Sequence, residues 1–373
     1  MKIGIISMQR VVNYGSFLQA YSLKTIIEKM GNEVEFIDYH VEPPLIEVKE
    51  ETVEVKQQSV VNKAIRYLWE HRSPKAVKLR NFYRAKMYLT KRYNEEFLPL
   101  LGVTDEKKYL CKEDAIVIGS DEVFNCLQTN KDVGYSKELF GKDANCDILI
   151  SYAASFGTTT LDGLKKYGID NEIADMLSEF DDISVRDKNS IEVVTTLVGE
   201  EPKYHVDPVF LSDYSGLVPD SVKLKDYMIV YAYGSRISET EAAAINAFAA
   251  QNNLKVVTIG ETNRFEWEHL MLTPFEVLAY FKNAEYVVTD TFHGSVFSIK
   301  YNKQFATIVR EGNRQKLMDL LSRFNLESRR VDDIADLGKI LKTQYNHEEV
   351  NTKIKTEREN SINYLRKYFG NEA

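Results

Sequence analysis

The sequence predicts an α/β protein with two parallel-sheet domains that face each other across a cleft. Three observations predict this fold class. The chain has 373 residues, enough for two domains with separate cores. Short apolar runs rich in β-branched residues alternate with amphipathic stretches of helical period along most of the chain. One stretch rich in Pro, Gly, Ser and Asp interrupts this alternation near the middle.

These patterns divide the chain into a first domain, a linker, a second domain and a final helix. The first domain covers residues 1–208 and contains a helical insertion at about 60–98. The linker is 209–226, the second domain is 227–345, and the highly charged segment 346–373 is expected to form a helix that crosses back to the first domain.

Composition excludes several classes of protein. The net charge is −8, so the chain as a whole does not attract nucleic acid. Its three cysteines lack metal-ligand spacing and are odd in number, which predicts free thiols in a reducing cytoplasm and no metal site. Neither a signal peptide nor an apolar run of about 20 residues is evident, so a cytoplasmic protein is expected.

The first βαβ unit begins with the apolar strand Lys2–Ser7 and continues through a turn to the amphipathic helix Phe17–Met30, which ends at Gly31. Val34–Asp38 is the next strand. Residues at the strand-to-helix turn are candidates for the cleft wall, because ligands collect at the carboxyl ends of parallel strands. They are Asn13, Tyr14 and Gly15. The alternative is that the glycine serves backbone geometry alone.

A change of charge follows this unit. Residues 42–60 are acidic and polar and predict a surface loop, whereas 63–92 hold ten Lys/Arg against the single acid Glu70. Apolar residues recur there at helical spacing and break at Ser73-Pro74, which predicts two basic amphipathic helices. A solvated face packed on the body is one interpretation; peripheral contact with a membrane leaflet or an anionic, lipid-linked glycan is the other.

Three further strands of the first half end in small polar turns. The strands are Asp114–Ile118, Ile148–Tyr152 and Asp182–Val185, with Tyr204–Val206 as a fourth and last. Parallel strands would bring the turns to one edge of a sheet, so we expect Ser120, Asp121 and Ser155 on the cleft wall. Arg186 is the cation at these strand ends and has the geometry to grip a carboxylate or phosphate; the alternative is an ion pair with Asp187 or another acid.

The second half repeats the alternation. The predicted elements, in order, are the strand Tyr227–Tyr233, the helix Glu239–Gln251, the strand Leu254–Ile259, the helix Thr273–Lys282, the helix Arg314–Phe324, the short strand Arg329–Val331, and the helices Asp333–Thr343 and Thr352–Phe369.

Between these elements, Tyr286–Ile308 is the stretch with the strongest functional signal. The strand Tyr286–Thr289 runs into a polar turn, a helix with Thr291 or Ser295 as its cap, and the strand Phe305–Val309. His293 therefore lies where a strand passes to a helix, beside N–H groups that favour an anion. An imidazole there suits acid/base chemistry, and a core histidine at a tight turn is the alternative.

Taken in order, these motifs resemble the polysaccharide pyruvyl transferase family. The matching segments are Asn13–Leu23, Val117–Asn125, Ser151–Gly157, Ile183–Ser190, His205–Leu211, Asn283–Ile299 and Asn313–Arg329. The resemblance implies a GT-B-like pair of Rossmann-like domains. It also implies transfer of pyruvate from phosphoenolpyruvate to a hexose of a polysaccharide or its lipid-linked precursor, as a cyclic ketal, with no cofactor.

The resemblance also implies roles for particular residues. It implies catalysis by His293 and Arg186, with Arg186 gripping the donor. Other residues of the turn are expected to help bind the donor: Thr291, Phe292, Gly294 and Ser295. Some relatives carry an arginine at the position of Thr291, so another cation is expected to replace it. Arg314 is our first choice, ahead of Lys303, Arg310 and Lys316. His205 and Asp207 are expected to be structural.

Two alternative functions remain open from the sequence. One is a glycosyltransferase of the same architecture that uses a nucleotide-sugar. The other is a non-catalytic glycan-binding relative, since a shared fold is not itself evidence of chemistry.

Overall fold

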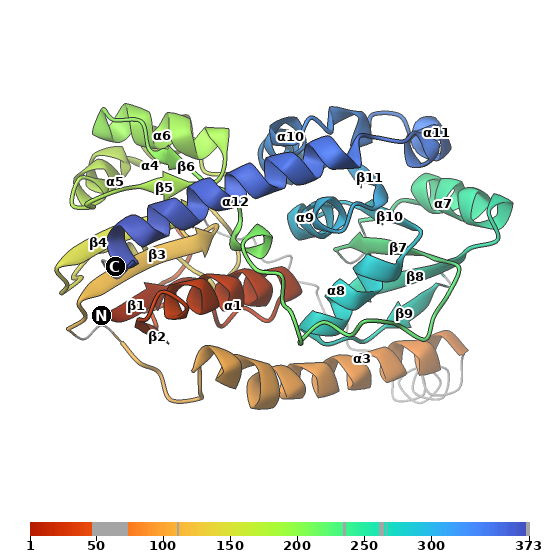
Figure 1. Ribbon diagram of the computed structural model, residues 1–373, viewed down its shortest axis with the longest axis horizontal. Helices are drawn as coiled ribbons and strands as arrows, with labels where there is room; N and C mark the ends of the chain where they lie inside the picture. The colour runs from red at the N-terminus through yellow and green to blue at the C-terminus, as the bar shows by residue number, and fades with distance from the viewer. Residues whose placement is uncertain (47–73, 110–111, 234–235, 261–264, 266, 371–373) are drawn as a thin grey trace, which may run out of the picture.

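The structure is a computed structural model with two six-stranded parallel sheets (Figure 1). It describes residues 1–46, 74–109, 112–233, 236–260, 265 and 267–370. The first sheet has the order β2-β1-β3-β4-β5-β6 and the second has the order β12-β11-β10-β7-β8-β9. The predicted fold class, two Rossmann-like domains, is therefore confirmed.

The strands of the first sheet are β1 (Lys2–Ile6), β2 (Glu33–Phe36), β3 (Ala115–Asp121), β4 (Ile148–Ala154), β5 (Ser184–Val185) and β6 (Lys203–Tyr204). Those of the second sheet are β7 (Tyr227–Ala232), β8 (Lys255–Gly260), β9 (Glu268–Leu270), β10 (Tyr286–Thr289), β11 (Gln304–Ile308) and β12 (Arg330–Val331). The strand order reverses between β1 and β3 in one sheet and between β7 and β10 in the other. Ligands bind at such reversals in open α/β sheets.

Helices cover both faces of each sheet. In the first domain they are α1 (Tyr14–Glu28), α4 (Leu161–Tyr167), α5 (Asp170–Leu177) and α6 (Lys188–Val198). In the second they are α7 (Glu239–Gln251), α8 (Pro274–Asn283), α9 (Phe292–Lys300), α10 (Arg314–Arg323) and α11 (Leu337–Lys342). None of the described helices is both long and apolar enough to cross a bilayer.

The second of the two predicted basic helices corresponds to α3 (Pro74–Arg92); the first lies outside the described residues. α3 continues into a π-helical turn, Tyr93–Phe97, and a 3₁₀ turn, Leu98–Leu101. It runs along the lower edge of the molecule in Figure 1, beneath both domains. The insertion therefore reaches the second domain as well as the first.

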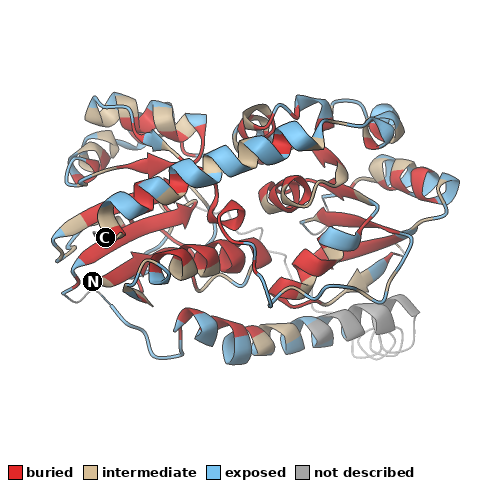
Figure 2. Cartoon of the chain, in the orientation of Figure 1, coloured by how far each residue is buried: buried red, intermediate tan, exposed pale blue. Residues whose placement is uncertain are grey.

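The C-terminal helix α12 (His347–Phe369) crosses from the second domain back to the first, as predicted (Figure 1). Its buried Tyr364 donates a hydrogen bond to the carbonyl oxygen of Ser151 in β4, at 2.9 Å. The carbonyl of Phe369 accepts a hydrogen bond from Asn32 beside β2. One side of α12 is exposed and the other buried, which explains its charged, amphipathic sequence (Figure 2).

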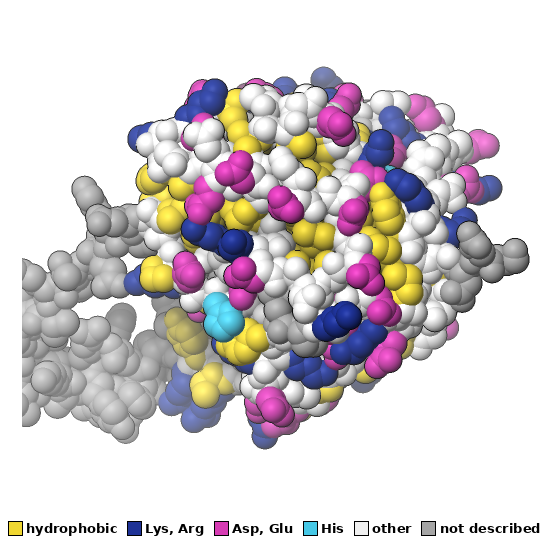
Figure 3. All heavy atoms as spheres, turned by 90° about the vertical axis from the view of Figure 1, so that its left-hand side faces the viewer, with side chains coloured by type: hydrophobic (Ala, Val, Ile, Leu, Met, Phe, Trp, Pro, Cys, Tyr) yellow, Lys and Arg dark blue, Asp and Glu magenta, His cyan; other side chains and the backbone are white. Residues whose placement is uncertain are grey.

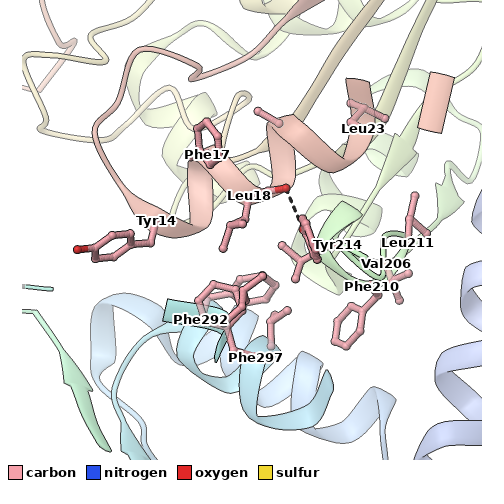
Figure 4. Packing of buried hydrophobic residues seen from close by; sticks show 14 of the residues in the cluster. Tyr14, Phe17, Leu18, Leu23, Val206, Phe210, Leu211, Tyr214, Phe292 and Phe297 are labelled. Atoms are coloured by element: carbon pink, nitrogen blue, oxygen red, sulfur yellow. Dashed lines mark hydrogen bonds between the residues drawn. The ribbon is translucent and has the colours of Figure 1, made fainter. Parts of the chain in front are cut away.

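One apolar cluster joins the two domains. It includes Phe17 and Leu18 of α1, Phe275 of α8, and Phe292 and Phe297 of α9. Figure 4 shows the two α9 phenylalanines facing Leu18, beside Tyr214, whose hydroxyl donates to the carbonyl of Leu18. Since the cluster extends across both sheets, the domains share a core instead of being separated by open solvent.

Charges are mixed on the end of the molecule that holds both termini. On that face acidic and basic side chains lie interspersed, not gathered by sign (Figure 3). No group of His, Cys, Asp and Glu side chains in the described part of the chain has a geometry that could hold a metal ion.

Several local predictions need correction. The predicted turn Gly119-Ser120-Asp121 is the end of β3, which pairs with β4 as far as Asp121. α1 begins at Tyr14 and not at Phe17, because the side chain of Asn13 accepts hydrogen bonds from the N–H groups of Gly15 and Ser16. β9, α4 and α5 were not predicted. These elements are only three to eight residues long, which is too short for a clear periodic pattern.

Candidate active site

His293 is the second residue of α9, and its position follows from how that helix begins. Thr291 is the N-cap, with its hydroxyl accepting from the N–H of Gly294 at 2.9 Å. Thr289, at the end of β10, donates its hydroxyl to the carbonyl of Tyr231 at 2.6 Å. These bonds attach the turn to β7, so the helix starts at a defined angle from the sheet.

The imidazole of His293 lies between two parts of the first domain. Its Nε2 is 3.5 Å from Oδ2 of Asp207, and 12% of its side chain is exposed. Its Nδ1 faces Gly15 so closely that a Cβ on Gly15 would lie 2.1 Å away. Only glycine leaves room for the ring at this position. Gly15, which was predicted to lie on the cleft wall, therefore packs directly against His293.

Asp207 also receives the guanidinium of Arg186. Nη1 of Arg186 donates to Oδ2 of Asp207 at 2.9 Å, and Nη2 donates to Oδ1 of Asp121 at the same distance. A single carboxylate oxygen thus contacts both the arginine of the first domain and the histidine of the second. The three residues follow the carboxyl ends of different strands: β6 for Asp207, β5 for Arg186 and β10 for His293.

Arg186 is enclosed by these partners. Its side chain is 2% exposed, and its guanidinium carbon lies 4.5 Å from the centroid of the Phe292 ring. Burial by itself lowers the pKa of this arginine, but Asp121 and Asp207 raise it overall. For Asp121, burial raises the pKa, and Arg186 and His293 more than reverse this, so the pKa is lowered. The guanidinium therefore stays charged, but both of its terminal nitrogens already donate hydrogen bonds to aspartates of the protein.

Sequence reasoning did not assign Asp207 to the site. The carboxylate follows β6 and belongs to the same edge as Arg186, so the strand-end rule that selected Arg186 would also have selected it. Asp187, in contrast, is not the partner of Arg186. Its carboxylate accepts from the hydroxyl of Ser155 at 2.6 Å and from the N–H of Ser190, so Asp187 is the N-cap of α6.

A pocket of about 130 Å³ opens beside His293. It is smaller than the roughly 300–1,000 Å³ of drug-sized ligand sites, so it suits a small polar molecule. The turn after β1 contributes Val12, Asn13 and Tyr14, and the second domain contributes Tyr231, Tyr233, Thr291 and His293. Lys86, Leu89, Thr90 and Tyr93 of the insertion close the remaining side. The pocket thus lies at the strand-order reversals of both sheets.

Other residues expected at the cleft brace it from behind. Ser120 and Ser155 are fully buried; the Ser120 hydroxyl donates to Gln19, and that of Ser155 donates to Asp187. Ser295 is also fully buried and bonds the carbonyl of Thr291. The hydroxyl of Ser16, which was not singled out, donates to Asp121 at 2.8 Å and holds the carboxylate that pairs with Arg186.

The four cations considered as replacements occupy different places. Arg314 is exposed at the first residue of α10. Arg310 pairs with Glu241 and Asp290, and Lys303 donates to two carbonyls. Lys316 forms an ion pair across the domains with Glu122, and its charge also acts on Tyr233 of the pocket. None of the four is among the residues that line the pocket; Lys316 is the one that links the two domains.

The arrangement defines a class of protein. Two Rossmann-like domains that face each other form the GT-B architecture, and here they enclose a small site with an imidazole beside a carboxylate at a helix N-terminus. In agreement, a putative UDP-N-acetylglucosamine 2-epimerase from Listeria monocytogenes superposes with a TM-score of 0.52 at 10% identity, covering 99% of this chain and 96% of the other.

Two further structures superpose with lower scores. Arabidopsis thaliana UGT89C1 complexed with UDP-L-rhamnose gives 0.48 at 13% identity, covering 99% of each chain. The glycosyltransferase SsfS6 of Streptomyces sp. SF2575, complexed with thymidine diphosphate, gives 0.44 at 11% identity, covering 98% of each.

The family follows from sequence. Residues 13–312 match the polysaccharide pyruvyl transferase family, and the chain belongs to it. Membership makes the protein a transferase. Comparison with curated proteins gave no match.

Proposed function

We propose that this protein transfers pyruvate from phosphoenolpyruvate to two hydroxyls of a hexose and forms a cyclic ketal. The observation that carries the proposal is the contact of His293 with Asp207, which Arg186 also holds, beside a small pocket at the start of α9. In a chain of the polysaccharide pyruvyl transferase family, this is a site where an imidazole can move protons next to a small anion.

The reaction requires two proton movements. The methylene carbon of the donor gains a proton and becomes a methyl group, while one acceptor hydroxyl adds to the neighbouring carbon and loses its proton. A second hydroxyl then displaces inorganic phosphate from that carbon and closes the ring, and its proton leaves with the phosphate. When Nε2 of His293 carries its proton toward Asp207, Nδ1 is left to accept a proton from the acceptor.

Binding of the anionic donor requires positive charge nearby. Arg186 does not supply it directly, since the terminal nitrogens of its guanidinium donate to Asp207 and Asp121. The first N–H groups of α9 supply part of it, because Thr291 and His293 both line the pocket. Lys86 also lines the pocket and supplies more. Arg186 then acts as a positioning residue that holds Asp207 against His293.

The test is phosphate release from phosphoenolpyruvate with a panel of glycans, together with thermal shift on phosphoenolpyruvate and on nucleotide-sugars. We expect phosphoenolpyruvate to raise the melting temperature and His293→Ala to abolish turnover while the protein stays folded. His40→Ala is the control, because His40 is an exposed histidine paired with Glu138. Stabilisation by nucleotide-sugars alone, or an active His293→Ala protein, would contradict the proposal.

A further inference from the structure

The insertion separates the pocket from a second, larger hollow. Lys86 and Thr90 of α3 line both. The second hollow has a volume of about 610 Å³ and is open to solvent along α3; we refer to it as the α3 groove. Its other lining residues are Tyr83, Met87, Lys91, Asn94, Glu95 and Asp105. The pocket and the groove are therefore neighbours that share one wall.

A buried hydroxyl marks the pocket side of this wall. Tyr93 is 1% exposed and lines the pocket, and its hydroxyl has no hydrogen-bond partner among the described residues. Burying such a hydroxyl without a partner costs free energy, so a ligand group that bonds it would recover that cost. Burial also raises the pKa of Tyr93, so the hydroxyl keeps its proton and can donate.

Local helix geometry divides these side chains between the two hollows. α3 changes into a π-helical turn at Tyr93, and such turns occur frequently at functional sites. Tyr93 lines the pocket, whereas Asn94 and Glu95 of the same turn line the groove. One turn of chain thus supplies polar groups to both.

The groove has the size and chemistry of a sugar site. Its volume lies within the range of small-molecule sites, whereas the pocket is too small for a donor and a hexose together. Hydroxyl, amide, carboxylate and ammonium groups offer donors and acceptors to sugar hydroxyls. The half-exposed ring of Tyr83 offers an apolar face to the C–H side of a pyranose.

We propose that the acceptor is a pyranose hexose bound in the α3 groove, with its reacting hydroxyls passing Lys86 and Thr90 to reach the hydroxyl of Tyr93 and the ring of His293. This assignment rests on the proposed function and names its acceptor subsite. The groove admits the sugar from solvent, while the smaller pocket keeps the donor next to α9.

The decisive variant is Tyr93→Phe, which removes only the unpartnered hydroxyl. A purely structural role predicts no loss of stability and no change in binding, since nothing in the described protein bonds that oxygen. The proposal predicts the same stability but about 3- to 10-fold weaker acceptor binding, the effect of one neutral hydrogen bond. Tyr135→Phe is the matched control, because Tyr135 is also buried with an unpartnered hydroxyl but lies outside this pocket.

The probes are methyl glucopyranoside, galactopyranoside and mannopyranoside, followed by saturation-transfer NMR with phosphoenolpyruvate present. We expect at least one glycoside to bind, and Tyr83→Ala to weaken it while Tyr83→Phe retains it. Phosphoenolpyruvate affinity, measured by calorimetry, should stay within twofold in the Tyr83 variants, because Tyr83 lines the groove and not the pocket.

Three results would overturn the subsite: no glycoside binding, unchanged binding in Tyr93→Phe, or weakening that is equal in Tyr135→Phe. A fourth is salt-sensitive binding to phosphatidylglycerol vesicles that Lys86→Ala removes without affecting glycosides, since this would identify the groove face as a membrane surface. If phosphoenolpyruvate fails to bind the unaltered protein, the proposed function fails instead, so the two failures are distinguishable.

Discussion

At the scale of single residues, the central feature is a carboxylate shared between an arginine and a histidine. Asp207 is 1% exposed at its side chain and contacts Arg186 at 2.9 Å and His293 at 3.5 Å. Removing one partner of a buried pair leaves an uncompensated charge, which is costly. The cluster therefore fixes Arg186 and prevents it from serving as a freely mobile anion clamp, and it places a carboxylate 3.5 Å from the imidazole, which makes no hydrogen bond to it.

The contact of Gly15 with His293 gives a residue-level prediction. Gly15→Ala places a methyl group 2.1 Å from Nδ1, so the imidazole must leave its position in the site. Misplacement of a reacting group by about 1 Å costs on the order of 100-fold in rate, and we expect a fall in turnover of at least that size. Overpacking of this kind costs about 1–3 kcal/mol, partly offset by the helix preference of alanine in α1, so the variant should stay folded at a somewhat lower unfolding free energy.

Phosphate-release kinetics and urea unfolding of the two proteins measure these effects. Gly338→Ala is the matched control, since this helical glycine has its nearest neighbour at 3.5 Å from the added methyl. Full activity in Gly15→Ala would show that the imidazole position is not critical.

His205 gives a prediction on pH. Burial, and then the charge of Arg323, lower the pKa of His205 from 6.5 to about 4. Between these values the unfolded chain binds a proton that the folded protein does not, so stability rises with pH from about 4 to 6.5 and is lost as pH falls through that window. The contribution is at most about 3 kcal/mol.

Urea unfolding of the native protein and of His205→Gln at pH 4.5 and pH 7 tests this. The variant should lose less stability on acidification than the native protein. His269, whose pKa burial also lowers to about 4, contributes equally to both proteins and cancels in the comparison. An equal loss in both would remove His205 as a source of the pH dependence.

At the scale of elements, α9 depends on its cap. Thr291→Val removes the hydroxyl that accepts from the N–H of Gly294, and loss of such a cap costs about 1 kcal/mol. Because α9 carries His293 and faces the pocket with its N-terminus, the same change should weaken phosphoenolpyruvate binding. Thr291→Ser keeps the hydroxyl and should restore both stability and binding, as measured by thermal unfolding and calorimetry.

α3 and α12 show how elements outside the sheets define the site. α12 attaches the second domain to β4 of the first through Tyr364, and α3 supplies the wall that separates the pocket from the α3 groove. We place no residue of either helix at the reacting atoms. Tyr93, which we propose contacts the acceptor, begins the π-helical turn that follows α3.

At the scale of the whole molecule, the shared apolar cluster predicts that the domains unfold together. Phe17 of α1 contacts the ring of Phe275 in α8 at a centroid distance of 6.0 Å, and both are buried. Phe17→Ala should therefore cost about 3–5 kcal/mol and destabilise both domains. Trp267, which packs with α7 in the second domain, reports that domain by fluorescence in a Trp69→Phe background.

Far-UV circular dichroism and Trp267 fluorescence should show one coincident urea transition that Phe17→Ala moves to lower urea. A Trp267 transition that stays unmoved, while the circular dichroism becomes biphasic, would show that the domains unfold independently.

The sequence by itself determined the α/β class, the order of most strands and helices, and the stretches that end at the site. These properties depend on the periodicity of apolar residues, on the residues that form turns, and on the rule that parallel strands end at one edge of a sheet. They can therefore be recognised in short segments of the sequence. It also pointed to His293, Arg186 and the turn Asn13–Gly15, which all lie at such strand ends.

Only the tertiary structure decided which of these side chains meet. Asp207 lies beside His293 across 86 residues of chain, Tyr93 lines the pocket 200 residues before His293, and Lys316 pairs with Glu122 across 194 residues. The physical reason is that a side chain's partner depends on the packing of distant elements, whereas its place at a strand end depends on its neighbours in sequence.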